Sequence, residues 1–287
     1  MLPATDTAVT YPSGATVSTG TALHSEPLGD GRSAVILDVT SAHPVDSAWP
    51  DQPADRGTLV VGADTVALLD CVVGATDGEA LYLAGDIPVR KGTEGWAFVV
   101  AHVIDGSIAD GATVEVRVDA DFRHALSAGH TACHLASLAL NSALADAWTK
   151  EVPLDGLGHP NFDSVAIESS TISENGSVDL YRIGKSLRKR GFTVAALDDL
   201  GAVATAVNAR LAEWVATDAA VTISRDGDGL TSRREWRCEL PGHPVSIPCG
   251  GTHLGSLSEL ASITIGLATD EVAGAVELRM MTTAVAA

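Results

Sequence analysis

The stretch DFRHALSAGHTACHLASLALNSALADAW, residues 121–148, decides how the second half of this chain folds. It is rich in alanine and leucine and contains no proline, which predicts one long helix. Several of its leucines fall near one face of that helix: Leu126, Leu135, Leu138 and Leu144. Residues four apart stand one above the other on a helix, so the imidazoles of His130 and His134 point the same way.

A second stretch, CGGTH at residues 249–253, supplies two more groups of the same chemical kind. The adjacent glycines Gly250 and Gly251 permit a tight turn, which lets the Cys249 thiolate and the His253 imidazole converge. Together with the two helical histidines they form a nitrogen and sulfur donor set that suits Zn²⁺. We therefore predict one zinc site made by His130, His134, Cys249 and His253. The alternative is a buried helix and an unrelated glycine turn.

Length and composition bound the kind of protein. The chain has 287 residues, 46% of them hydrophobic and only 12 of them proline, which is typical of a globular protein with a sizeable core. It has no run of eighteen apolar residues, and residues 1–31 lack the basic start and apolar core of a signal peptide. A metal-bound Cys249 would leave three cysteines, which is no disulfide framework. We expect a cytoplasmic protein that does not engage a membrane.

The charge is strongly acidic, with a formal net charge of −19 from 18 basic and 37 acidic residues. Such a field repels phosphate backbones, so we do not expect DNA as a partner. One basic cluster is the exception, and its spacing is that of a helix: Arg182, Lys185, Arg188, Lys189 and Arg190. The cluster is either a positive patch that contacts RNA phosphates or an ordinary solvated helix face.

The first part of the chain carries short strand patterns separated by turns. Residues 1–32 are rich in Thr, Ser, Gly and Pro and predict an irregular or weakly stranded lead-in. Strands are expected at residues 34–37, 58–61, 66–73, 81–83, 96–104 and 113–118. This spacing predicts a small antiparallel β-barrel as an N-terminal domain over residues 1–118.

The second part mixes helices with antiparallel strands. After the helix at 121–148 we expect, within residues 178–190, a strand end or turn that leads into a basic helix. A long helix should follow at 196–217, with strands at 220–224, 263–267 and 275–280. These elements predict a metal-binding α+β domain over residues 119–287, and the whole chain is of the α+β class.

The HTACHL and CGGTH motifs resemble the editing domain of alanyl-tRNA synthetase and its free-standing AlaX-type relatives. Further matches are Arg123, seven residues before His130; the upstream Gln52-Pro53, Asp55 and Gly57; Arg234, Pro241 and Gly242; and Asn208 late in a helix. The resemblance spans about residues 35–267. It departs from the family at Trp49-Pro50-Asp51, where the family has a glycine run, and at Leu257, where threonine is common.

The resemblance implies a zinc-dependent hydrolase that removes serine or glycine from mischarged tRNA(Ala), contacting the acceptor end of the tRNA. It implies catalytic roles for His130, His134, Thr131 and Gln52. Substrate contacts would come from Thr252, Gly250, Gly251 and the basic cluster. Thr131 and Thr252 are equally suited to hydrogen-bond local backbone.

Two alternatives stay open. The altered loop at Trp49-Pro50-Asp51 also fits a hydrolase of another aminoacyl-tRNA or of a small aminoacyl ester. Four protein ligands normally mark a closed structural zinc site, so a non-catalytic zinc module that binds RNA is the alternative from another class. The oligomeric state does not follow from the sequence.

Overall fold

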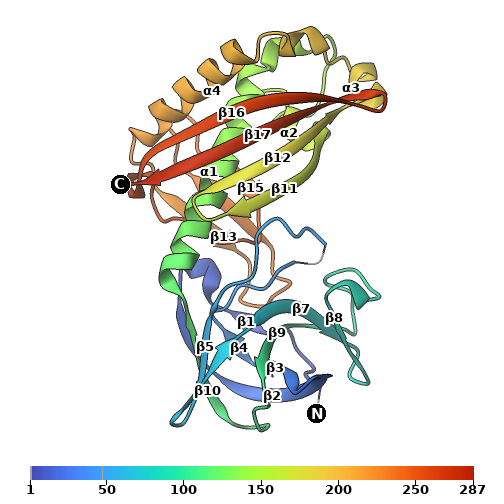
Figure 1. Cartoon of the computed structure of the whole chain (residues 1–287), viewed down its shortest axis with the longest axis vertical. Helices are drawn as coiled ribbons and strands as arrows, with labels where there is room; N and C mark the ends of the chain where they lie inside the picture. The colour runs from blue at the N-terminus through green and yellow to red at the C-terminus, as the bar shows by residue number, and fades with distance from the viewer. Residues whose placement is uncertain (1, 47) are drawn as a thin grey trace. The chain divides into compact units, whose positions relative to one another are not determined.

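The computed structural model describes residues 2–46 and 48–287 and has an α+β fold in which most strands pair antiparallel (Figure 1). The predicted fold class is therefore confirmed. The chain forms two compact units. Unit 1 contains the residues up to His124 with segments 223–235 and 249–252, and unit 2 contains segments 125–222, 236–248 and 253–287. The boundary at residues 118/119 between two folding domains stays a prediction.

Unit 1 is built on an eight-stranded sheet in the order β6-β5-β10-β2-β3-β9-β7-β8. Its strands are β2 (Val17–Gly29), β3 (Arg32–Leu37), β5 (Gly57–Val61), β6 (Asp64–Leu68), β7 (Asp70–Thr76), β8 (Leu81–Leu83), β9 (Ala97–Asp105) and β10 (Thr113–Val118). Only Leu69 separates β6 from β7, yet β6 pairs with β5 whereas β7 pairs with β9. Residues 64–76 therefore form two consecutive strands that pair near opposite ends of the strand order. The sheet curls into a half-barrel.

The irregular or weakly stranded lead-in predicted for residues 1–32 is wrong at residues 17–29, because β2 is a thirteen-residue strand between β10 and β3. Its Thr, Ser and Val residues suit a half-buried pleated strand despite the low overall hydrophobicity. A turn with positive φ at Gly29, Asp30 and Gly31 then reverses the chain into β3. A short parallel pair, β1 (Ala8–Val9) with β4 (Val39–Thr40), lies outside the large sheet.

The core of unit 1 fills the inside of the curled sheet with aliphatic side chains that are almost fully buried, among them Leu37, Leu59, Val100 and Val116. The central strands β3 and β9 are also covered on their other face, where Ala34, Ile36, Val99 and Ala101 form a second cluster. Burial on both faces explains why these strands read as continuous apolar runs instead of an alternating pattern.

Unit 2 contains the long helix α1 (Ala120–Ala143) and a four-stranded antiparallel sheet in the order β11-β12-β17-β16. The strands are β11 (Ile167–Ser173), β12 (Gly176–Ile183), β16 (Leu260–Val272) and β17 (Ala275–Ala286). The helix approaches the β11–β12 hairpin so closely that a Cβ on Gly129 would lie 2.4 Å from the Ser173 carbonyl oxygen. Glycine immediately before His130 therefore permits the packing that places the histidines.

Both long helices are shorter than predicted: the first ends early, and the second both starts late and ends early. The 121–148 helix ends at Ala143 and is followed by a 3-10 turn, η3 (Ala145–Ala147). The 196–217 helix is the 3-10 turn η4 (Val194–Leu197) followed by α4 (Leu200–Val215), which starts where the Asp199 side chain caps Ala202 N–H. Figure 1 shows α4 running beside β16.

Smaller elements complete the fold. The short helices are α2 (Phe162–Ala166) and α3 (Lys185–Lys189), and the 3-10 turns are η1 (Tyr11–Ser13), η2 (Ala84–Asp86) and η5 (Leu257–Glu259). A three-stranded sheet has the order β13 (Val221–Arg225), β14 (Arg234–Cys238), β15 (Val245–Pro248). No helix among the described residues combines the length and apolarity needed to cross a membrane.

Candidate metal centre

The two sequence motifs meet in one cluster. Helix α1 supplies His130 and His134, and the turn that follows β15 supplies Cys249 and His253. One donor atom from each residue lies within 4.8 Å of the donor atoms of the others. The imidazole centroids are 4.8 Å apart for His130 and His134, and His253 lies 4.3 and 5.0 Å from them. This cluster could bind a metal ion.

The protonation of His134 fits a ligand role. Burial lowers the pKa of its imidazole to about 4, so the ring is neutral near pH 7, which is the form that binds metals. Its Nε2 atom is buried and has no hydrogen-bond partner among the described residues. An unsatisfied buried polar atom costs about 1–3 kcal/mol, so its presence calls for a further partner. A metal ion at the cluster is a partner of the right kind.

The thiol of Cys249 completes the donor set. Burial raises its pKa to about 12, while the Gly251 N–H, 3.5 Å from Sγ, acts in the opposite direction. The thiol is therefore protonated at neutral pH until a cation displaces the proton, as metals do with coordinating thiols. The Cys249 backbone N–H donates to the Arg234 carbonyl oxygen at 3.1 Å, which fixes the start of the turn on β14.

Thr131 holds His253 in place. The Thr131 Oγ1 atom lies 3.2 Å from His253 Nδ1 and accepts a hydrogen bond from the Leu254 backbone N–H at 3.2 Å. Thr131 is fully buried. A hydrogen bond at one ring nitrogen of a histidine ligand commonly sets the orientation of the ring. The structure thus gives Thr131 a clear contact with a histidine of the cluster.

Gln52 makes a two-point contact with the CGGTH turn. Its Nε2 donates to Thr252 Oγ1 at 2.9 Å, and its Oε1 accepts from the Thr252 backbone N–H at 3.0 Å. Both residues are buried. The amide of Gln52 therefore braces the residue next to His253, across 200 positions of sequence. Gly250 and Gly251 form the turn between Cys249 and this brace, and a Cβ on Gly250 would meet no atom within 4 Å.

The other matched positions of the upstream motif have structural partners in unit 1. Asp55 forms a buried two-point ion pair with Arg123, through Nε at 2.8 Å and through Nη2. Arg123 also donates to the Ser41 carbonyl oxygen at 2.8 Å. A Cβ on Gly57 would lie only 2.2 Å from the Arg117 carbonyl oxygen, so the strand pair β5–β10 requires glycine there.

Sequence reasoning missed Trp236 on β14. Its side chain is fully buried, and its ring centroid lies 5.0 Å from that of His134 and 6.0 Å from that of His253. The stretch REWRCEL does alternate in the period of a strand, and that was the available signal. No spacing rule links position 236 to the two histidines, because strand and helix meet only in the fold.

The basic cluster lies elsewhere in unit 2, and one part of its description was wrong. Arg182 is on strand β12, because the strand continues to Ile183 and α3 begins only at Lys185. All five cationic side chains are exposed. Arg188 donates to the carbonyl oxygen of Gly274 at 3.0 Å, which fixes α3 beside the β16–β17 hairpin turn.

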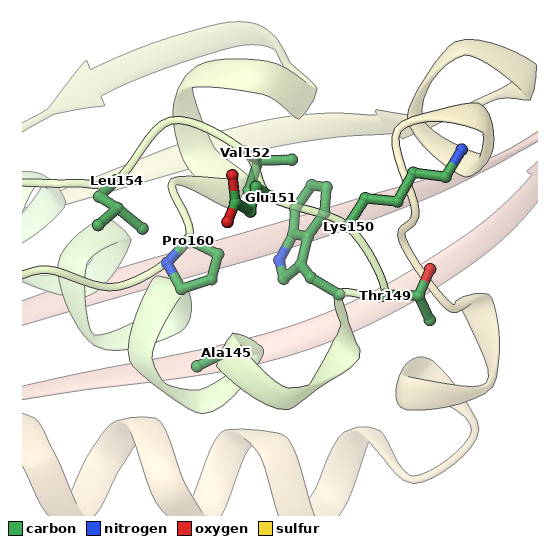
Figure 2. Close-up of a pocket in the computed structure, with 8 residues that line it drawn as sticks. Ala145, Thr149, Lys150, Glu151, Val152, Leu154 and Pro160 are labelled. Atoms are coloured by element: carbon green, nitrogen blue, oxygen red, sulfur yellow. The ribbon is translucent and has the colours of Figure 1, made fainter.

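The pocket in Figure 2, with a volume of about 580 Å³, also belongs to unit 2. It follows the end of α1 and is lined by Ala145, Trp148, Thr149, Lys150, Glu151, Val152, Leu154 and Pro160. Figure 2 shows Lys150 extending away from Leu154 and Pro160, and its Nζ donates to the Lys189 carbonyl oxygen at 2.9 Å. None of the four cluster residues lines this pocket.

Comparison with known proteins gives a partial similarity. No protein-family model matches the chain. Over 98 residues, 31% of this chain, the sequence is 39% identical to the alanine–tRNA ligase of Pseudomonas entomophila (strain L48). The matched segment is 11% of that ligase, so the chain corresponds to only a small part of the relative's length. The chain is thus similar to one segment of an alanine–tRNA ligase.

Proposed function

We propose that this protein is a zinc-dependent hydrolase that clears mischarged tRNA(Ala) in trans, releasing serine or glycine from the 3′ end of the tRNA. The observation that carries the proposal is the convergence of three imidazoles and a thiol within 4.8 Å. The partial identity to an alanine–tRNA ligase supports tRNA as the substrate. The AlaX-type resemblance of HTACHL and CGGTH supports editing as the reaction.

The donor set fits zinc. His130, His134, Cys249 and His253 would hold the ion, since neutral imidazoles and a thiolate are its preferred ligands. When bound, zinc supplies Lewis acidity that polarises an ester carbonyl or activates a water molecule. Four protein donors leave an open position only if one of them moves away or if the coordination number expands.

The chain's own residues would position the reactants. Thr131 keeps His253 in one orientation, and Gln52 holds Thr252, so the last two residues of the CGGTH motif are fixed before substrate arrives. In the reaction, the oxygen of water bonds to the ester carbonyl carbon and the bond to the ribose oxygen breaks. The products are the free amino acid and the tRNA hydroxyl. Aminoacyl esters hydrolyse readily, so positioning supplies much of the rate enhancement.

The basic cluster would contact the phosphates of the tRNA. Its five exposed cations stand on a chain with a net charge of −19, and no ion pair is found for them among the described residues. The triple variant R188E/K189E/R190E should weaken deacylation strongly at low salt and progressively less at high salt, because phosphate contacts are screened. Equal activity of variant and wild type at 50 mM salt would remove the basic cluster from the proposal.

The test is hydrolysis of Ser-tRNA(Ala) and Gly-tRNA(Ala) by the purified protein, with and without prior chelation. We expect turnover that is lost on chelation and restored by zinc. The variant H134A should lose both bound metal and activity, whereas the matched control H243A, which removes an exposed loop histidine, should keep both. Release of the amino acid at the uncatalysed rate, at every protein concentration, would rule the proposal out.

A second candidate is a structural zinc module that binds RNA without hydrolysing it. The observation in its favour is the count of four donors, which is the number found in closed zinc sites. This candidate predicts that chelation unfolds the protein and that no aminoacyl-tRNA is hydrolysed. A chelated protein that keeps its far-UV circular dichroism but loses turnover would exclude it.

A further inference from the structure

Trp236 occupies a position that packing alone does not explain. It is the largest fully buried side chain of the described residues, with 0% exposure, and it stands in the middle strand of the β13-β14-β15 sheet. Its indole lies in ring contact with His134 and His253, at centroid distances of 5.0 and 6.0 Å. A wholly apolar side chain would fill the same volume without bringing a hydrogen-bond donor into the core.

The indole N–H of Trp236 is buried and has no hydrogen-bond partner among the described residues. Tryptophan carries only this one polar atom, a donor, and buried indole N–H groups usually find an acceptor. The adjacent His134 ring carries a second buried polar atom with no hydrogen-bond partner among the described residues, its Nε2. Two unsatisfied polar atoms on neighbouring buried rings indicate that a ligand completes this region, because each would otherwise carry a desolvation cost.

The Trp236 indole N–H and the His134 Nε2 atom require different kinds of partner. The lone pair of a neutral imidazole nitrogen suits a cation, and the cluster of donors around His134 provides for one. An indole N–H cannot interact favourably with a cation and needs an acceptor, for which an oxygen atom is the common choice. An oxygen atom of a ligand bound at the cluster would supply the acceptor that the indole N–H lacks.

We propose that Trp236 is a substrate-binding residue whose indole N–H donates a hydrogen bond to the carbonyl oxygen of the aminoacyl ester. This proposal rests on the proposed function, because it takes the ester as the ligand. The hydrogen bond strengthens as negative charge develops on that oxygen during attack by water. Trp236 therefore contributes to the rate of the chemical step more than to substrate affinity.

The first test compares W236F with W148F. Phenylalanine keeps an aromatic ring in contact with the histidines and removes the N–H. Trp148 is the matched control, because its Nε1 is also buried without a partner while its ring packs against Phe192 in place of the cluster. We expect W236F to lower kcat on Ser-tRNA(Ala) by about 10- to 100-fold with little change in KM and with unchanged bound zinc. W148F should match wild type in all three quantities.

The second test needs neither turnover nor a variant at position 236. The ¹H–¹⁵N spectrum of zinc-loaded W148F protein, in which Trp236 is assigned, is recorded with a non-hydrolysable seryl-adenosine amide. We expect the Trp236 indole proton resonance to move downfield on binding, as a new N–H···O hydrogen bond requires. Seryl-adenosine amide binding that leaves this resonance in place would overturn the proposal, even if W236F were inactive through misfolding.

The two proposals fail separately. If wild type hydrolyses Ser-tRNA(Ala) while W236F is equally active, the role of Trp236 is overturned and the deacylase stands. If wild type has no activity, the indole resonance still tests the role of Trp236. A downfield shift on binding of the seryl-adenosine amide supports the hydrogen bond from Trp236 to the carbonyl oxygen, and an unmoved resonance overturns it.

Discussion

The substitution Asp55→Asn separates structural from catalytic roles within the motif that precedes the helix. Asp55 accepts two bonds from Arg123 and one from the His43 backbone N–H at 2.5 Å. The side chains of Asp55 and Arg123 are 0% and 5% exposed. Asparagine has nearly the same shape, so it removes the charge and one acceptor without opening a cavity.

The expected loss is large, because the guanidinium stays buried without its counter-charge. Breaking a buried ion pair by removing one partner costs about 3–5 kcal/mol. An amide also presents N–H groups where the carboxylate accepted bonds, so at least one donor of Arg123 or His43 faces another donor. At about 2–4 °C per kcal/mol for a protein of this size, the transition that includes unit 1 should shift down by roughly 6–20 °C.

The assay is urea unfolding followed by far-UV circular dichroism, with thermal melts as a second readout. The matched control is Glu213→Gln, the same carboxylate-to-amide change in the Arg210–Glu213 pair, whose side chains are 48% and 65% exposed. Such a surface pair contributes at most about 1 kcal/mol. A D55N protein within about 1 kcal/mol of wild type would refute the structural role given to this pair.

Three further predictions follow from single contacts. Gly57→Ala should lower the free energy of unfolding by about 1–3 kcal/mol, because its Cβ would meet the Arg117 carbonyl oxygen, whereas Gly85→Ala, with open space, should be nearly neutral in the same urea titration. Asn208→Ala should cost about 1–3 kcal/mol in thermal melts, since its amide pairs with both the N–H and the carbonyl of Ile265 on edge strand β16, and an unchanged midpoint would contradict this. Burial lowers the pKa of His102 to about 4, below its unfolded value of 6.5, so the unfolded chain takes up the proton first and stability falls as pH drops from about 6.5 to 4. Protonation of this residue should lower the free energy of unfolding by about 3 kcal/mol over that pH range. His102→Gln should therefore reduce the pH dependence of the unfolding free energy, measured by urea titrations at pH 7 and pH 5.

The helix and the turn of the candidate site follow from local sequence. Periodicity places four leucines of the 121–148 segment inside, and Leu126, Leu135, Leu138 and Leu144 are indeed buried. An H-x-x-x-H spacing on a helix fixes the relative direction of two imidazoles before any tertiary structure is known. A Gly-Gly pair likewise predicts a turn. These local rules explain why the four donor residues could be named from the sequence.

The supporting contacts could not be derived from spacing, because they join distant segments. Gln52 meets Thr252 across 200 positions, and Asp55 meets Arg123 across 68. Their positions were suggested by the family resemblance alone, and their partners emerge only from the fold. Trp236 matched no motif, and the strand alternation around it does not show that it contacts the two histidines.

Strand β2 shows why composition alone does not predict every strand. Its Ser, Thr and Gly residues look like a loop by composition, yet its neighbours β10 and β3 supply the hydrogen bonds that make it a strand. Strand formation depends on partners that a single segment does not reveal. Arg182 was assigned to the basic helix for the opposite reason, since charge grouping was taken as helical spacing where the β12 strand still continued.

The most direct measurement of the central claim is a zinc titration of the metal-free protein, with bound zinc and Ser-tRNA(Ala) hydrolysis recorded on the same samples. The account predicts that the hydrolysis rate rises in proportion to bound zinc and levels off at one equivalent per chain, and that H130A and H134A neither bind that equivalent nor gain activity. A rate that does not change between zero and one bound equivalent would contradict the account.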